Sequence, residues 1–559
     1  MSSQRITADL PRPTVDEATS DETERRLSGL LRNLRARLDA SASFRARHEP
    51  LARLMSADAL SHPPIRALMD EAAPAIAAGT DSWRILVQAV ASKATALGLP
   101  SGCWAEIARR TFVSSARRGE VIVPASATPN FFSVVAAGAV AIVVHDDRDR
   151  RSIVQIAKPG FIFSLAPFMS RSEQRRFAAI AYEDAVVASV DREVVRDVLR
   201  RLGPDSHMGL LMYMCRALSR IIYDHCRFFR TEVPDRVLQQ LVELARRFGS
   251  DGEPGVVNLR LSQTDIADLV GATRATVSHA LTMLEKQGLV LRARGRYRVA
   301  PAVLARRSVR MSFGPGSTGD AVRGDPGARD TLYAVLRAAW KRLGSPAKAI
   351  DIFRECATLH RHASGDVMGM GPQPAVTLLV EGTARVECMI PGGDPVGVRI
   401  ATPGQFIGVG WSVDAPDRQR PFRARALTDV MVARLELADM QRVVAALDDE
   451  QFLLLLGMYS NLLSRQIYDR CVMLPMTVDR RVDYVLRSLA DEFPRADGSG
   501  TIIDLPQRED DIAVLVGAQR EAVCRRAIAP AKRSGSISVV DGRFRLAGYR
   551  PAAKPDADR

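Results

Sequence analysis

The nine residues Leu218–Cys226, LSRIIYDHC, occur a second time with few changes as Leu463–Cys471, LSRQIYDRC. Arg220 and Arg465 are 245 positions apart. Two further pairs flank these stretches in the same order: KPGFIF at 158–163 resembles TPGQFI at 402–407, and LVGA at 269–272 recurs at 515–518. Chance similarity between helical segments is the alternative explanation. The preserved order and nearly constant offset instead indicate two copies of one domain-sized unit, which excludes a short-period solenoid.

The composition is that of an ordinary globular protein with a strongly basic balance. The chain has 559 residues, of which 47% are hydrophobic and 25% charged, and its formal net charge is +14. This length predicts three or more domains. The positive charge suggests a polyanionic partner such as nucleic acid, although arginine-favouring codon usage explains it equally well.

The cysteines and the N-terminus point to a reducing cytoplasm. The seven cysteines form no CxxC pair, so neither a disulfide framework nor a zinc site is expected. The first residues contain no signal-peptide core. The apolar run Phe131–Val144 is too short to span a membrane and is interrupted by Gly138, which predicts two strands joined by a turn.

Each copy begins with short β-branched segments separated by Gly, Pro and Asp. This pattern is typical of a β-barrel or jelly roll. The predicted strands are Glu120–Val123, Phe132–Val135, Val140–Val144, Ile153–Ile156 and Ala185–Val190 in copy one, and Thr377–Val380, Ala384–Cys388, Val396–Ile400 and Val430–Leu435 in copy two.

A long amphipathic helix follows in each copy. Its apolar residues recur every three or four positions, as expected for one stripe along several turns. Such a stripe is either a core face or a dimerising seam, and its place between two domains favours the seam. The stripe residues are Leu210, Leu211, Met214, Ala217, Leu218, Ile221 and Ile222 in copy one, and Leu455, Leu456, Tyr459, Leu462, Leu463 and Ile467 in copy two.

Residues 261–284, LSQTDIADLVGATRATVSHALTML, have the pattern of a helix-turn-helix. Ser262 is a helix N-cap signal, Gly271 permits the tight turn, and Thr273 caps the second helix. A wing hairpin is predicted over Leu289–Val299, where arginines suit phosphates. The candidate DNA-contacting residues of this segment are Ser262, Gln263, Thr273, Arg274, Thr276, Ser278, His279, Arg294 and Arg296.

Residues 505–528, LPQREDDIAVLVGAQREAVCRRAI, repeat the arrangement, with a second wing at Ile537–Leu546 turning at Asp541-Gly542. Arginine can bind guanine bidentately, and glutamate can accept a hydrogen bond from cytosine. A solvated charged face on an ordinary helix is the alternative. The candidate DNA-contacting residues here are Gln519, Arg520, Glu521, Arg525 and Arg543.

The repeat and the order of its parts resemble the cyclic-AMP receptor protein/FNR (Crp/Fnr) family over residues 100–305 and 345–550. The resemblance implies an α+β fold with two copies of a cupin-like (jelly-roll) sensor barrel, long dimerisation helix and winged helix-turn-helix. The family's Arg-Glu-x-x-x-Arg motif is intact as Arg520-Glu521…Arg525. Copy one keeps Arg274 but has Ala275 and His279 at the other positions, so base specificity is expected to differ.

Pro530 falls where copy one has Leu284. A proline there clashes with the carbonyl of Arg526, so we expect the second recognition helix to end about a turn early. A degenerate, purely structural second winged helix is the alternative.

The family's cyclic-nucleotide pocket is altered in both copies. Leu165 and Val409 stand at the position of the glutamate that binds the ribose, and an apolar side chain cannot accept that hydrogen bond. Neither pocket is therefore expected to bind cyclic AMP in the usual way. The remaining arginines suit a different anion, or are simply surface residues. The weak effector-site candidates are Ser164, Arg175, Arg176, Gly408 and Arg420.

No cofactor or metal is expected. There is no N-terminal cysteine cluster for iron–sulfur, and Cys226 and Cys471 fall on apolar helix faces as core residues do.

The expected organisation runs from an N-terminal extension to a C-terminal tail. It comprises an N-terminal helical and partly disordered extension (1–94, with helices at Glu22–Leu38 and Trp83–Leu97), barrel one (95–202), dimerisation helix one (203–232), winged helix one (233–305), a flexible linker (306–334), barrel two (335–447), dimerisation helix two (448–476), winged helix two (477–550) and a disordered tail (551–559).

These features predict a transcription regulator whose partner is double-stranded DNA. RNA polymerase and an unknown small-molecule effector remain open as further partners, and no membrane is involved. The two copies could pair within one chain and bind an asymmetric operator, or the whole chain could form a homodimer. A non-DNA scaffold with decayed copies is the second function class. An enzyme is disfavoured because no P-loop, HExxH or GxSxG motif occurs.

Overall fold

The computed structural model describes residues 111–125, 131–163, 177–249, 253–293, 295–305, 317, 319–322, 325–368, 375–407 and 422–551. The helices expected at Glu22–Leu38 and Trp83–Leu97 lie outside these ranges. Within them, no helix combines the length and the apolar character needed to cross a membrane.

The first half begins with a β region of two four-stranded antiparallel sheets, ordered β1-β8-β3-β6 and β2-β7-β4-β5. The two strands predicted within Phe131–Val144 are present as β3 and β4. They are joined at Gly138, which has φ of +78°. The strands are β1 (Thr111–Ala116), β2 (Val121–Val123), β3 (Phe131–Ala137), β4 (Val140–His145), β5 (Arg151–Ala157), β6 (Ile162–Phe163), β7 (Ala178–Ala181) and β8 (Ala185–Asp191).

A second β region follows the first helix-turn-helix, and its strands are connected in the same way. Its sheets are ordered β11-β12-β18-β14 and β13-β17-β15-β16. An isolated bridge from Leu378 to Phe406 stands where β3 pairs with β6 in the first half. The strands are β11 (Asp320–Val322), β12 (Thr358–His362), β13 (Val367–Met368), β14 (Ala375–Glu381), β15 (Ala384–Cys388), β16 (Val396–Ala401), β17 (Phe422–Ala426) and β18 (Val430–Glu436).

The linker expected over 306–334 is wrong in its second part. Asp320–Val322 is strand β11, which pairs with β12, and helix α14 begins at Pro326. Pro326 and Gly327, within the predicted linker, begin this helix, because Asp325 accepts a hydrogen bond from the Ala328 amide and proline is favoured at the first helical position. Two helices thus precede most of the second β region: α14 (Pro326–Ala339) and α15 (Ala347–Cys356).

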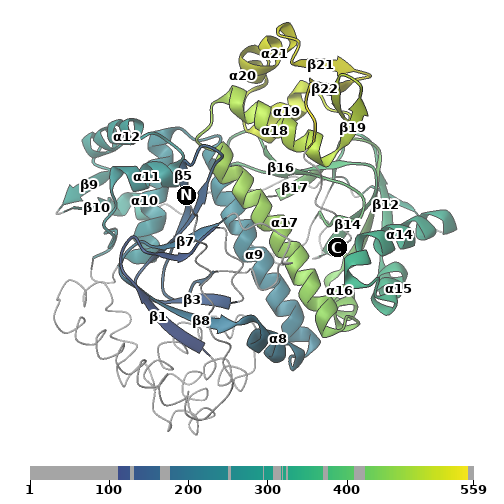
Figure 1. Cartoon of the computed structure of the whole chain (residues 1–559), viewed down its shortest axis with the longest axis horizontal. Helices are drawn as coiled ribbons and strands as arrows, with labels where there is room; N and C mark the ends of the chain where they lie inside the picture. Colours follow the sequence, from purple (N-terminus) through teal and green to yellow (C-terminus); the bar gives the residue numbers. More distant parts are fainter. Residues whose placement is uncertain are drawn as a thin grey trace, which may run out of the picture.

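Two 25-residue helices, α9 (Pro204–Phe228) and α17 (Asp449–Met473), run side by side through the centre of the molecule (Figure 1). The shorter helices α8 (Arg192–Arg200) and α16 (Leu437–Ala445) precede them at the same end. Most residues of the predicted stripe are buried, including Leu211, Ile222, Leu455 and Leu456. The two long helices therefore pack against each other within a single chain.

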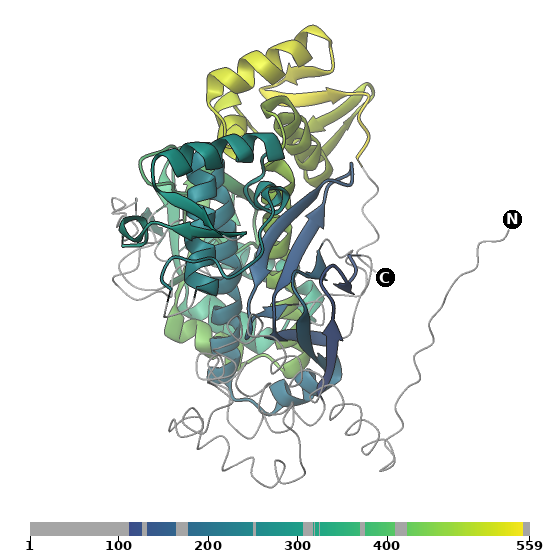
Figure 2. The ribbon, with the colours of Figure 1, turned by 90° about the vertical axis from the view of Figure 1, so that its left-hand side faces the viewer.

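Two helical regions lie at the other end of α9 and α17 (Figures 1 and 2). The first comprises α10 (Val233–Phe248), α11 (Gln263–Val270), α12 (Arg274–Lys286), the hairpin β9 (Val290–Ala293) and β10 (Arg296–Val299), and α13 (Pro301–Leu304). The second comprises α18 (Val478–Glu492), β19 (Pro494–Asp497), β20 (Gly500–Ile503), α19 (Glu509–Val516), α20 (Arg520–Val523), the π-helix η4 (Cys524–Ile528), α21 (Ala529–Arg533), β21 (Ile537–Val540) and β22 (Arg543–Ala547).

Candidate nucleic-acid interface

The first helix-turn-helix forms as its local signals predict. Ser262 and Asp265 make a reciprocal capping box at the start of α11. Gly271 ends α11 in the left-handed conformation, with φ of +61°, and Thr273 caps α12 by accepting from the Thr276 amide. The Ser262 and Thr273 hydroxyls are therefore already engaged in capping.

The exposed face of α12 carries most of the predicted contact residues. Val277, Leu281 and Leu284 are buried against α10 and α11. The residues left at the surface are Thr273, Arg274, Thr276 and His279, whereas Ser278 is half-buried, as is Gln263 on α11. The predicted contact residues of this helix thus include one cation, Arg274, and several hydrogen-bonding groups, which are the kinds of side chain that contact base edges.

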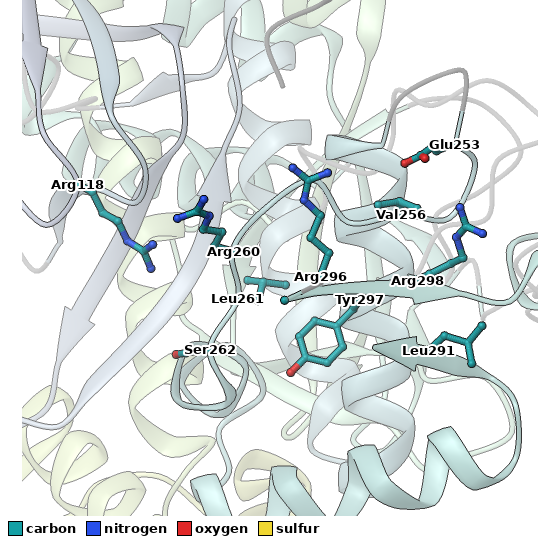
Figure 3. Close-up of a pocket in the computed structure, with 11 residues that line it drawn as sticks. Arg118, Glu253, Val256, Arg260, Leu261, Ser262, Leu291, Arg296, Tyr297 and Arg298 are labelled. Carbon is teal, nitrogen blue, oxygen red and sulfur yellow. The ribbon is translucent and has the colours of Figure 1, made fainter. Parts of the chain in front are cut away.

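The first wing borders a groove of about 810 Å³ that also reaches the β1–β2 turn (Figure 3). Arg296 is half-buried and donates from Nη1 to the amide oxygen of Asn258 at 3.2 Å. Arg298, Arg260 and Arg118 are exposed and also line the groove. Arg294, predicted for this wing, lies outside the described residues.

The second recognition helix does not end early at Pro530, contrary to the expectation. It continues from α20 through η4 into α21 and reaches Arg533. In η4 the Ala529 amide bonds to the Cys524 carbonyl, five residues back. This widened turn relieves the clash that a proline makes with the carbonyl four residues earlier.

The wide turn holds one extra residue. Gly271 and Gly517 are 246 positions apart, whereas Gly288 and Gly535, which follow the recognition helices with φ of +67° and +74°, are 247 apart. A π turn is the usual way for a helix to absorb a single insertion. After the bulge, Pro530 therefore corresponds to Met283 and not to Leu284.

The predicted DNA-contacting residues of the second recognition helix are exposed, and two of them have carboxylate partners. Arg520 lies 3.4 Å from Asp510, and the Gln519 amide donates to Asp394 at 3.4 Å. Glu521 and Arg525 are exposed. On the wing, the Nε of Arg543 lies 3.2 Å from Asp504.

Each helix-turn-helix is held on its own β region through one aspartate. In the first half, Asp265 lies 3.2 Å from Arg151 and 3.1 Å from the Tyr182 hydroxyl. Burial raises the pKa of Tyr182, so this hydroxyl stays a donor. In the second half, Asp511 pairs with Arg385, which also binds the fully buried Glu387 at 2.6 Å.

Each helix-turn-helix also touches the long helix of the opposite half. An added Cβ at Gly271 would overlap the side chain of Leu474, and one at Gly517 would overlap Phe229. Phe229 and Leu474 directly follow α9 and α17. The two contacts exchange equivalent partners, as expected around a two-fold axis.

Equivalent half-buried arginines support these turns. Arg236 donates to Thr231 O at 2.7 Å and to Val270 O at 3.2 Å. Arg481 donates to Met476 O at 3.0 Å and to Val516 O at 3.4 Å. Burial lowers the pKa of Arg481 to about 10. Each guanidinium thereby satisfies the carbonyl at the end of its first helix.

The candidate effector-site residues are not placed by the structure, and three arginines that line the groove were not predicted from the sequence. Ser164, Arg175, Arg176, Gly408 and Arg420 all lie outside the described residues. The sequence reasoning did not select Arg118, Arg260 or Arg298. Arg260 and Arg298 were detectable as further cations next to the cap and wing, whereas Arg118 is joined to the groove only by the fold.

Two family models match the first half of the chain. A cyclic nucleotide-binding domain matches residues 113–202, and a Crp-like helix-turn-helix domain matches residues 235–306.

Among curated proteins, the nitrogen fixation regulation protein FixK of Azorhizobium caulinodans is 30% identical over 221 residues, covering 36% of this chain and 86% of that protein. A CRP-like cAMP-activated global transcriptional regulator of Mycobacterium tuberculosis is 28% identical over 175 residues, covering 31% and 77%.

Two solved structures are also similar. The regulator CLP of Xanthomonas campestris, titled as c-di-GMP responsive, has a TM-score of 0.32 and 18% identity, covering 36% of this chain and 99% of that one. FixK2 of Bradyrhizobium japonicum has a TM-score of 0.27 and 26% identity, covering 34% and 92%. The identity to FixK and the two matched domains lead to one conclusion: the chain belongs to the Crp/Fnr family of DNA-binding transcription regulators, which are not enzymes.

Proposed function

We propose that this chain is a sequence-specific regulator in which two Crp/Fnr-like protomers are fused and form an intramolecular pseudo-dimer on an asymmetric operator. The observation that carries the proposal is the exchange of equivalent contacts, Gly271 with Leu474 and Gly517 with Phe229. The strand order shared by the two β regions supports the duplication: β1-β8-β3 matches β12-β18-β14, and β2-β7-β4-β5 matches β13-β17-β15-β16.

The two recognition helices differ, which favours an asymmetric operator. The first is regular and offers Arg274, Thr276 and His279, whereas the second offers Arg520, Glu521 and Arg525 around a π turn. Different side chains at the base-contacting positions select different bases. A two-fold dimer of this family type reads half-sites about one helical turn apart, so we expect two unlike half-sites at that spacing.

Selection of bound sequences from random duplex DNA by the full chain, with mass measurement in solution, tests the proposal. Two unlike half-sites and a monomeric mass at physiological salt are expected. A homodimeric mass or a palindromic motif would contradict the pseudo-dimer. Binding without sequence preference, with only a steep salt dependence, would favour the non-DNA scaffold.

The effector of this regulator, on the same proposal, is not cyclic AMP bound in the usual mode. Leu165 and Val409 support this, since neither can accept a hydrogen bond from ribose. Calorimetric titration with cyclic AMP tests it. Micromolar binding that a Leu165 or Val409 variant abolishes would contradict it.

A further inference from the structure

The arginines of the two wings differ in their ion-pair partners. In the first half, Arg296 donates to the neutral amide of Asn258. Glu253 also lines the groove, but no carboxylate in the described part of the chain lies within ion-pair distance of Arg118, Arg260 or Arg298. In the second half, the equivalents of Arg296 and Arg298 are ion-paired: Arg543 with Asp504 at 3.2 Å, and Arg545 with Asp497 at 3.1 Å.

One difference, Asn258 against Asp504, lies in the segment before each helix-turn-helix, and this segment pairs with the wing in both halves. In the second half, residues 494–503 form the hairpin β19–β20, which joins the wing in one sheet and brings Asp497 and Asp504 beside it. The hydrogen bond from Arg545 lowers the pKa of Asp497. At the matching positions that the structure describes, the first half has Asn258 for Asp504 and Arg260 for Pro506. Asp251, which stands at the position of Asp497, lies outside the described residues.

The first half also adds a cation from its β region. Arg118 lies in the β1–β2 turn, with its guanidinium 5.8 Å from the centre of the Tyr182 ring. Figure 3 shows it on the opposite side of the groove from Arg296 and Arg298, with Arg260 between them. In the second half, the corresponding turn has Ser364 before Gly365.

We propose that this groove binds the DNA phosphate backbone beside the first half-site, through Arg118, Arg260, Arg296 and Arg298, and that the second wing makes no equivalent contact. The inference rests on the proposed function. A small ligand would need a site that buries most of its surface. Here Arg118, Arg260 and Arg298 are exposed, and the groove continues to Ser262 at the start of α11, as suits a long polyanion.

The test is the salt dependence of binding of the full chain to a 30-base-pair duplex of fixed sequence. Each phosphate contact contributes about 0.9 to the slope of log K against log salt, so the Arg118→Ala/Arg260→Ala/Arg298→Ala variant should lose about 2 to 3 from its magnitude. Arg118→Lys should retain the contribution of Arg118. The control, Arg442→Ala at an exposed arginine of α16, should leave the slope unchanged. The parallel second-wing variant, Arg543→Ala/Arg545→Ala, should reduce the slope by less than the triple variant, because both arginines are already ion-paired.

Exchanging the side chains at Asn258 and Asp504 provides a second test. Asn258→Asp should give Arg296 a carboxylate partner and reduce the slope, whereas Asp504→Asn should not reduce it. The inference would be overturned if the triple variant kept both the slope and the thermal unfolding midpoint of the unaltered chain. It would also be overturned if the Arg543→Ala/Arg545→Ala variant reduced the slope as much as the triple variant does.

The remaining outcomes separate this inference from the proposed function. Titration with inorganic diphosphate tests whether the groove is a small-anion site. Tight diphosphate binding that Arg118→Ala abolishes, together with an unchanged salt slope for duplex binding, would show such a site and overturn the inference. If the unaltered chain binds no duplex at all, the proposed function itself fails.

Discussion

His207 and Phe452 occupy equivalent positions in the two halves and stack on each other, with ring centroids 4.2 Å apart and an interplanar angle of 15°. They lie at the start of α9 and α17, where the two helices meet. The His207 imidazole also bonds to the Leu199 carbonyl at 2.8 Å. Pairing two copies of the first half here would instead place two histidines together, so this contact favours unlike halves.

Removing the Phe452 ring should therefore destabilise both halves together. Phe452 is fully buried, and truncating a buried phenylalanine costs about 3 to 5 kcal/mol. We expect Phe452→Ala to lower the free energy of unfolding in urea by that amount. Val539→Ala, at a side chain that is 50% exposed, is the control and should change little. An effect of Phe452→Ala no larger than the control would contradict a tight seam.

Alanine at Gly271 should disturb the contact with Leu474. A left-handed conformation alone costs a non-glycine residue roughly 1 to 2 kcal/mol. Gly288 has a similar φ of +67° but open space around it, so Gly288→Ala measures that backbone cost alone. We expect Gly271→Ala to lose more stability in thermal unfolding than Gly288→Ala. Equal losses would mean that the contact between halves contributes nothing.

The π turn should make Pro530 almost neutral. Because η4 already removes the clash, Pro530→Ala should change the unfolding free energy by less than about 1 kcal/mol. The matched change in the first half is Met283→Pro, which places a proline in a regular helix and should cost about 3 kcal/mol. Chemical denaturation of both variants tests this. Similar effects would show that the π turn does not accommodate the proline.

The buried ion network of the second half should be more sensitive to mutation than its counterpart. Glu387 is fully buried and contacts Arg385 at 2.6 Å and Arg423 at 2.7 Å. Removing one partner of a buried pair costs about 3 to 5 kcal/mol, whereas an exposed pair is worth about 1 kcal/mol or less.

We therefore expect Glu387→Ala to lower the unfolding free energy far more than Arg151→Ala, whose side chain is 38% exposed. Hydrogen exchange in α19 would report release of the second helix-turn-helix. Equal losses from the two variants would contradict this ranking.

Acid should weaken the fold through His225. This imidazole is buried, and Nδ1 donates to the Ile221 carbonyl at 2.9 Å. Burial lowers its pKa below the usual 6.5. Below pH 6.5 the His225 imidazole binds a proton in the unfolded chain but stays neutral in the folded chain. The free energy of unfolding therefore falls as pH decreases from 6.5.

His225→Gln should flatten the dependence of unfolding free energy on pH between 7.5 and 5.5. His279→Gln, at an exposed histidine, should leave it unchanged. An identical pH dependence in His225→Gln and the unaltered chain would contradict the assignment.

The sequence alone determined the local elements and their order. The strands within Phe131–Val144, the cap at Ser262 and the turn at Gly271 were predicted because each depends on residues only a few positions apart. The repeat at a constant offset likewise needed no structure. The same local reasoning failed at Asp325-Pro326, where a helix start resembles a flexible linker.

Only the tertiary structure decided what residues distant in the chain do to one another. It placed Leu474 on Gly271 and Phe229 on Gly517, and it paired Arg543 with Asp504 while Arg296 met Asn258. It also showed that one inserted residue is absorbed as a π turn. Ion pairs and side-chain packing act over a few ångströms in space, so their partners become known only when the chain is folded.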